Sequence, residues 1–177
     1  MSDTVKLTAR EIRRLFELLD AELAKSDTKG ELYLVGGAVM CLVFNARPAT
    51  RDVDAWFRPT ALVREAAARV AAGAGVPATW LNDGVKAYLS ARGDFNAYLE
   101  LDHLSVFVAQ PAYLLAMKCA AMRLGEEFHD LDDVRYLLRY LNISTAEEAL
   151  AIVVSYYDEA LLPLKTRLAL EELLPRR

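Results

Sequence analysis

The chain has 177 residues, a formal net charge of -4 and a hydrophobic fraction of 54%, which describes one core-forming domain, alone or with a helical extension, and excludes a disordered chain. The acidic balance gives no general support for nucleic-acid binding, although it leaves room for a local basic patch. No apolar run reaches the roughly 18 residues of a membrane span, and the N-terminus has no apolar h-region, so we expect a cytoplasmic protein with no membrane segment.

The N-terminal part alternates helices and short strands. Thr8 and Glu11 have the spacing of a capping box before an amphipathic stripe that ends near Leu23. The stretch 80–90 is ambiguous, and we expect a short helix there. The other expected elements are a strand at 32–35, a helix at 38–45, an acidic strand at 52–57, a helix at 61–72, and two strands at 96–101 and 104–108 that would suit a hairpin.

Everything after Pro111 is predicted to be helical, at about 111–124, 128–141, 145–157 and 158–173, with Ser144 and Glu147 capping the third helix. Cys41 and Cys119 lie in apolar helical stretches and are expected to be small buried hydrophobes. The pattern predicts an α+β fold, a mixed β-sheet flanked by helices. Residues 1–110 would form the core, and 111–177 a helical C-terminal region packed on it as one compact unit.

The most informative stretch joins a Gly36-Gly37 pair to Asp52-Val53-Asp54. In a strand the two carboxylates share one face about 7 Å apart, which suits a hard cation. A glycine turn that opens a helix suits a phosphate, because backbone N–H groups and the helix dipole point towards it. Each feature alone is weak, since glycine pairs are common in plain turns and acids at strand ends are commonly solvated. Together they are more specific, because nucleotidyl transfer needs a phosphate site beside a metal site.

These residues resemble the motif of the nucleotidyltransferase superfamily that shares the DNA polymerase β-like fold. Its pattern is hydrophobic-Gly-Gly/Ser, a spacer, then Asp-hydrophobic-Asp/Glu-hydrophobic. Here the spacer at 38–51 is about as long as the family usually allows. The segments 47–54, 80–83, 111–123 and 130–133 are similar to those of AbiEii-type and DUF6036-type nucleotidyltransferase-like proteins. The resemblance covers roughly residues 30–141.

The resemblance implies a polymerase β-like mixed sheet, an NTP substrate, and Mg²⁺ or Mn²⁺ as the cofactor. It implies that Asp52 and Asp54 hold the metal as catalytic residues, and that Gly36, Gly37 and Arg51 contact the nucleotide.

The resemblance also implies that Lys118 is catalytic and contacts the NTP phosphates, and that Asp130, and less firmly Asp133, takes part in the activity. From the residues alone, Lys118 could instead snorkel out of its apolar helix, and Asp130 could be an acid favoured at a helix N-terminus. Arg123 could pair with Asp130 or with a phosphate.

Many members of this superfamily use a third strand carboxylate. The candidates are Glu100 and Asp102, which would share a face of one strand, but neither lies in a matching motif, so catalytic competence stays open. His103 and His129 have no partner at ligand spacing and are interpreted as structural or surface residues.

We therefore expect an enzyme that binds NTP with Mg²⁺ and transfers a nucleotidyl group to an RNA, such as a tRNA, or to a protein hydroxyl. The resemblance implies a toxin-like role with a possible cognate antitoxin. The alternative is a catalytically inactive nucleotide-binding or protein-interaction module on the same fold. A third interpretation is a structural domain whose acids only solvate a strand end.

Overall fold

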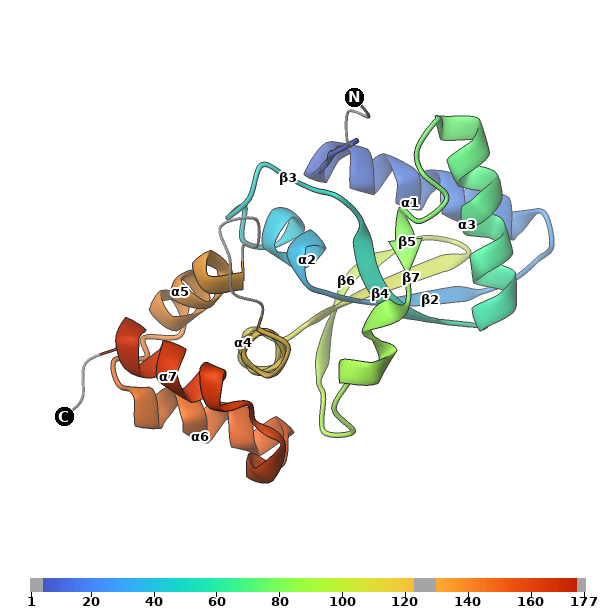
Figure 1. The fold of residues 1–177 in the computed structure, drawn as a ribbon. Helices are drawn as coiled ribbons and strands as arrows, with labels where there is room; N and C mark the ends of the chain where they lie inside the picture. Colours follow the sequence, from blue (N-terminus) through green and yellow to red (C-terminus); the bar gives the residue numbers. More distant parts are fainter. Residues whose placement is uncertain (1–4, 123–129, 175–177) are drawn as a thin grey trace. The chain divides into compact units, whose positions relative to one another are not determined.

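The computed structural model describes residues 5–122 and 130–174. Arg123 and His129, considered above, lie outside these residues. The chain forms two compact units, residues 1–87 with 95–109, and residues 88–94 with 110–177. The first unit contains the sheets, and the second is built from helices (Figure 1).

The first unit is organised around a mixed five-stranded sheet with the order β5-β4-β2-β7-β6. The central strand β2 is antiparallel to β4 and parallel to β7, and β6 and β7 form the expected antiparallel hairpin. Its elements are β1 (Leu7–Thr8), α1 (Ala9–Ala24), β2 (Gly30–Val35), α2 (Gly37–Leu42), β3 (Ala49–Thr50), β4 (Val53–Arg58), α3 (Thr60–Ala74), β5 (Leu81–Asn82), η1 (Gly84–Tyr88), β6 (Phe95–Glu100) and β7 (Leu104–Ala109).

Helix α1 begins as its sequence predicts. The Thr8 side chain accepts a hydrogen bond from the Glu11 amide, and the Glu11 carboxylate accepts one from the Thr8 amide. Helices α1 and α3 lie over the same face of the sheet (Figure 1). That face buries the alternate residues of β4, namely Val53, Ala55 and Phe57. The intervening residues Asp54, Trp56 and Arg58 therefore point to the opposite face.

The helix predicted at 80–90 is wrong in its first part. Leu81 and Asn82 pair in parallel with Val53 and Asp54 and so extend the sheet as β5, and only then does the short 3-10 helix η1 follow. Trp80 anchors this strand, because its buried indole N–H donates to the carbonyl of Ala67 on α3 at 3.0 Å. A tertiary pairing therefore overrides an ambiguous local sequence.

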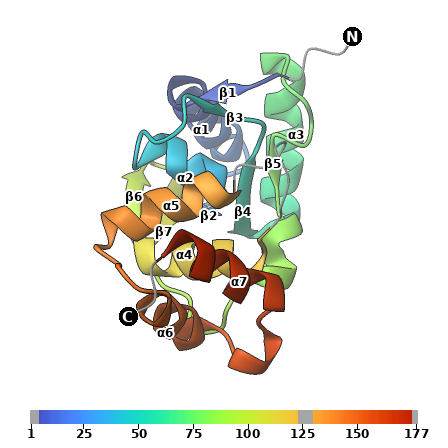
Figure 2. The ribbon, with the colours of Figure 1, turned by 60° about the vertical axis from the view of Figure 1, so that its left-hand side comes forward.

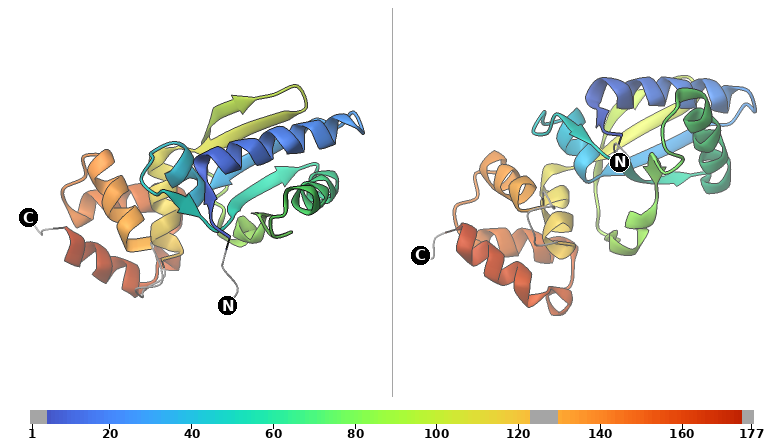
Figure 3. Two further views of the ribbon diagram at one scale, coloured as in Figure 1. Left: turned by 90° about the horizontal axis from the view of Figure 1, so that it is seen from above. Right: turned by 45° about the horizontal axis from the view of Figure 1, so that its top comes forward.

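The second unit contains α4 (Pro111–Ala120), α5 (Asp130–Tyr140), α6 (Ala146–Tyr156), η2 (Glu159–Leu161) and α7 (Leu164–Leu173). Helix α4 packs against α5 and α6, and α7 packs against α6 (Figure 3). The capping box of α6 lies one residue later than predicted, since Thr145 and Glu148 exchange the two bonds. The single helix expected at 158–173 is divided into η2 and α7, because Pro163 stands at the N-cap of α7.

Both cysteines are buried, as the sequence predicts. Burial raises the pKa of the Cys119 thiol on α4 to about 12, and Cys41 lies on α2.

Candidate functional site

The two motif aspartates lie at one end of the sheet. Asp54 is on β4, opposite Val35 at the end of β2 and next to Asn82 of β5. Asp52 immediately precedes β4, and the amide of Asn82 donates to its carboxylate at 2.9 Å. Both aspartates are half-buried. The two carboxylates are two residues apart in the sequence, Asp52 lies just outside the strand, and the Asn82 amide orients its carboxylate. Carboxylate oxygens are the ligands that a hard cation prefers.

The glycine turn lies directly against this cluster. Gly36 has φ 69° and ψ -150°, a backbone conformation that is essentially restricted to glycine. A Cβ at Gly36 would stand 3.1 Å from Oδ2 of Asp54, so the missing side chain is what allows the carboxylate to approach the turn. The positive φ belongs to Gly36 rather than Gly37.

Gly37 begins α2 under a different pair of side chains. A Cβ there would be 2.8 Å from Nη1 of Arg47 and 2.9 Å from Oγ1 of Thr50. The Arg47 guanidinium therefore lies beside Gly37, and the Asp54 carboxylate lies beside the preceding residue, Gly36. A cation and an acid thus flank neighbouring residues of the same turn.

The loop that carries Arg47 is held by strand β1. Strands β1 and β3 form a small antiparallel sheet in which Leu7 pairs with Thr50 (Figure 2). The Thr50 hydroxyl also donates to the carbonyl of Asp52 at 3.3 Å. Arg51, expected to contact nucleotide, is exposed on the same loop.

Sequence reasoning did not assign roles to Arg47, Thr50 and Asn82. All three belong to the segments 47–54 and 80–83, which carried the family resemblance. The signal was therefore present, but it did not distinguish these side chains from their neighbours.

Neither candidate for the third carboxylate reaches the aspartates. Glu100 pairs with Ser105 on β7, which aligns with Glu31 on β2, whereas Asp54 aligns with Val35. Four residues of strand separate these two positions on β2, about 13 Å along the sheet. Asp102 is not on the strand at all, because β6 ends at Glu100. The expectation that Glu100 and Asp102 share a strand face is therefore wrong.

In the part of the chain that the structure describes, no group of three or more His, Cys, Asp or Glu side chains is arranged to hold a metal ion. A cation on Asp52 and Asp54 would need other oxygens, from phosphate or water, to complete its coordination.

The other predicted site residues form a buried ion cluster in the second unit. The Lys118 ammonium on α4 lies 2.7 Å from a carboxylate oxygen of Asp133 and 3.3 Å from one of Asp130, both on α5. The three side chains are only 11%, 3% and 5% exposed, in the order Lys118, Asp133, Asp130. Lys118 therefore does not snorkel into solvent. It is held by two carboxylates, and burial makes this cluster sensitive to the loss of any member.

Comparisons of the chain with protein-family models, with curated proteins and with solved structures find no match. Among the described residues, no helix has the length and apolar character to cross a membrane. The geometry defines an α+β protein with a mixed sheet and an acid-and-glycine cluster at one end of it.

Proposed function

We propose that the first unit is a nucleotidyltransferase domain of the polymerase β-like type that binds a nucleoside triphosphate with Mg²⁺ or Mn²⁺. The observation that carries the proposal is the contact between the Asp54 carboxylate and the Gly36 turn, implied by the 3.1 Å distance to a Cβ built at Gly36. A phosphate on the turn would lie beside a cation on the acids, which is the juxtaposition that nucleotidyl transfer requires.

The donor set fits a hard divalent cation. Asp52 and Asp54 offer half-buried carboxylate oxygens, and the Asn82 amide orients the Asp52 carboxylate. When bound, the cation would supply charge stabilisation for the phosphoryl group and for the pyrophosphate that leaves. Asp52 and Asp54 would hold the cation beside the glycine turn, where a phosphate on the turn could reach it.

The phosphate side of the site is supported by the turn and by Arg47. The first amides of a helix lack intrahelical partners and favour an anion, and Gly36 lets the backbone approach closely. The Arg47 guanidinium over Gly37 adds a planar, permanently charged donor group suited to phosphate oxygens. Arg51 on the same loop is the second cation assigned to the nucleotide.

The test is isothermal titration of the full chain with ATP, GTP, CTP and UTP, each with and without Mg²⁺. The double substitution Asp52→Asn with Asp54→Asn should abolish Mg²⁺-dependent binding. Glu100→Gln with Asp102→Asn is the matched control, because it removes the same charge from the opposite end of the same sheet and should leave binding unchanged. Wild-type affinity in the aspartate double mutant would show that the motif does not bind nucleotide.

A second candidate is a nucleotide-binding module that does not catalyse transfer. It is favoured by the positions of Glu100 and Asp102, which supply no third carboxylate to the aspartates. Incubation with α-labelled NTP and either total RNA or total protein separates the two. Covalent label that depends on Asp52 and Asp54 supports the enzyme and identifies the acceptor as RNA, such as a tRNA, or as protein. Mg²⁺-dependent binding without label supports the module. We also propose a toxin-like role with a cognate antitoxin. The acceptor identified by the labelling would be the candidate target of such a toxin.

A further inference from the structure

Helix α7 is anchored to the second unit by one side. The Thr166 hydroxyl, which is buried, donates to the carbonyl of Cys119 on α4 at 2.7 Å. Ala169 and Leu170 are buried as well, and residues three and four positions after Thr166 lie on the same side of a helix. These contacts fix the rotation of α7 about its own axis. The opposite side of the helix therefore faces outward, at the edge of the second unit (Figure 3).

This outer face of α7 has an apolar centre. The face consists of four exposed residues, Leu164, Lys165, Leu168 and Glu172. Leu164 and Leu168 are 69% and 51% exposed, and their spacing of four makes them neighbours on the helix surface. Leu161, just before the helix, is 74% exposed. Single exposed leucines are ordinary, but three within eight residues form a patch of the kind that marks an interaction surface.

The outer face also carries two opposite charges. Lys165 and Glu172 are seven residues apart, which is about two helical turns. Within the described residues, neither side chain forms an ion pair or a hydrogen bond. Arg167 differs, because it is paired with Glu159 of η2 at 2.9 Å. The positive charge at one end of the outer face and the negative charge at the other are therefore available to a second molecule.

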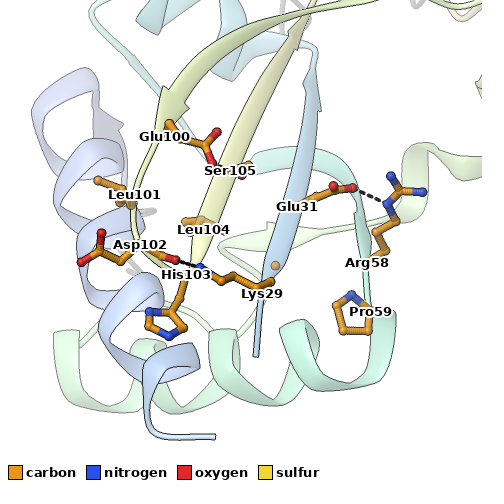
Figure 4. Close-up of a pocket in the computed structure, with 11 residues that line it drawn as sticks. Lys29, Glu31, Arg58, Pro59, Glu100, Leu101, Asp102, His103, Leu104 and Ser105 are labelled. Atoms are coloured by element: carbon orange, nitrogen blue, oxygen red, sulfur yellow. Dashed lines mark hydrogen bonds and ion pairs between the residues drawn. The ribbon is translucent and has the colours of Figure 1, made fainter. Parts of the chain in front are cut away.

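The charges that line the cavity of the first unit, about 390 Å³ in volume, are used within that unit (Figure 4). The Arg58 guanidinium is ion-paired with Glu31. The Lys29 ammonium donates to the backbone carbonyl of Asp102. Because acids and cations line the cavity together, it offers no uniform charge to a ligand, whereas the outer face of α7 presents a simple pattern of charge.

That pattern is complementary to itself. Lys165 lies three residues before Leu168, and Glu172 lies four residues after it. When a second α7 crosses antiparallel to the first, with a twofold axis near Leu168, each Lys165 faces Glu172 of the second copy. Leu168 then meets its own equivalent at the axis. An isologous contact requires this kind of self-complementarity. In a parallel arrangement each charge would instead meet the same charge.

We propose that the outer face of α7 binds the same face of a second copy of this chain, antiparallel, in a twofold-symmetric dimer. The leucines supply the apolar centre, and the two Lys165–Glu172 pairs set direction and register. One lysine beside one glutamate gives no net positive charge for a nucleic-acid backbone. The 10 residues of α7 span about 15 Å, so the contact is smaller than a standard interface and the dimer should be weak. The proposed nucleotide site takes no part in it.

The experiment is sedimentation velocity of the full chain at low salt, without nucleotide, from about 10 μM to about 1 mM, the range of weak association. Leu168→Glu should raise the dimer dissociation constant by about tenfold or more, because it removes the apolar centre and brings two carboxylates together at the axis. Leu62→Glu is the matched control. Leu62 is 46% exposed on α3 of the first unit, and its replacement should leave the dissociation constant unchanged.

Charge reversal tests the direction of the two helices. Lys165→Glu and Glu172→Lys should each raise the dissociation constant by about tenfold at low salt, since each turns two attractive pairs into two repulsive ones. The variant with both reversals should return to the wild-type constant, because every glutamate again faces a lysine. An equimolar mixture of the two single variants should associate for the same reason, and this also shows that both are folded.

The results separate cleanly. A dimer that is weakened by Leu168→Glu and by each single reversal, and is recovered in the double reversal, supports the proposal. A monomer at every concentration overturns it. A dimer that Leu168→Glu does not weaken uses another surface and also overturns it. Weakening by Leu168→Glu without any effect of the single reversals overturns the antiparallel contact. Thermal unfolding of each variant is recorded beside its sedimentation, so that loss of fold is not taken for loss of the contact.

Discussion

Replacement of Gly36 by alanine is the most direct test of the site geometry. Gly36 has φ 69° and ψ -150°, where a side chain costs about 1–3 kcal/mol. The new Cβ would also stand 3.1 Å from Oδ2 of Asp54, so the carboxylate or the turn must shift by a few tenths of an ångström. We expect Gly36→Ala to lower the free energy of unfolding of the first unit by about 2 kcal/mol from the backbone conformation, the middle of that range, and by a further amount from crowding against Asp54.

Gly75→Ala is the matched control for this substitution. Gly75 also has φ 69°, at the C-terminal cap of α3, but nothing lies within 4 Å of a Cβ built there. Gly75→Ala should lower the free energy of unfolding only by the cost of a left-handed backbone conformation, about 1–2 kcal/mol. In the Gly36→Ala background, Asp54→Ala should recover the part due to crowding, about 0.5 kcal/mol or more for residues in contact. Gly75→Ala should show no such coupling to Asp54→Ala.

Urea unfolding followed by tryptophan fluorescence is the suitable assay. Trp56 and Trp80 are the two tryptophans of the chain, and both belong to the first unit, so the signal reports that unit. If Gly36→Ala is as stable as wild type, or if Asp54→Ala is additive with it, then the carboxylate does not lie against the turn and the basis of the proposed function is lost.

Four further substitutions test three other parts of the structure. Thr145→Ala should lower the free energy of unfolding by about 1 kcal/mol and Ser144→Ala by less, as measured by circular dichroism, because Thr145 is the N-cap of α6. The hydrogen bond from Arg58 holds the pKa of Glu31 below its ordinary 4.5, so the pair stabilises the fold above that pH; the stability difference between wild type and Arg58→Gln should shrink as the pH falls below 4.5. Lys118→Met should lower stability by about 3–5 kcal/mol, since it removes the amine from two buried carboxylates; a loss below about 1 kcal/mol would contradict the buried cluster.

The sequence predicts elements well where the signal is local. The capping box at Thr8 and Glu11 and the hairpin of β6 and β7 are confirmed, because capping bonds and alternation over six residues are properties of short segments. The α+β class follows from these elements. Strand β5 could not be predicted, because two residues acquire strand structure only by pairing with Val53 and Asp54.

In the candidate site, too, the sequence predicts the residues of a local motif but not those that only the tertiary structure brings together. Asp52, Asp54 and the two glycines are visible as a motif, but Arg47 and Asn82 become parts of the cluster only through a loop held by β1 and a strand held by β4. Glu100 illustrates the opposite error. It has the right chemistry, yet the antiparallel return of β6 places it at the far end of the sheet.

Lys118 is the residue for which the structure changes the argument most. Two carboxylates already face its ammonium, so the cluster is not by itself attractive to a triphosphate, and phosphate binding would require the 2.7 Å pair with Asp133 to open. If Lys118 serves the nucleotide, Asp133→Asn should tighten NTP binding by releasing the amine, and Lys118→Met should weaken it about tenfold. If the cluster only stabilises the helical unit, both substitutions lower the stability of the fold and leave the NTP dissociation constant unchanged. Titration calorimetry on the two variants, at a temperature where both are folded, distinguishes these outcomes, and an unchanged affinity in both would remove Lys118 from the catalytic residues.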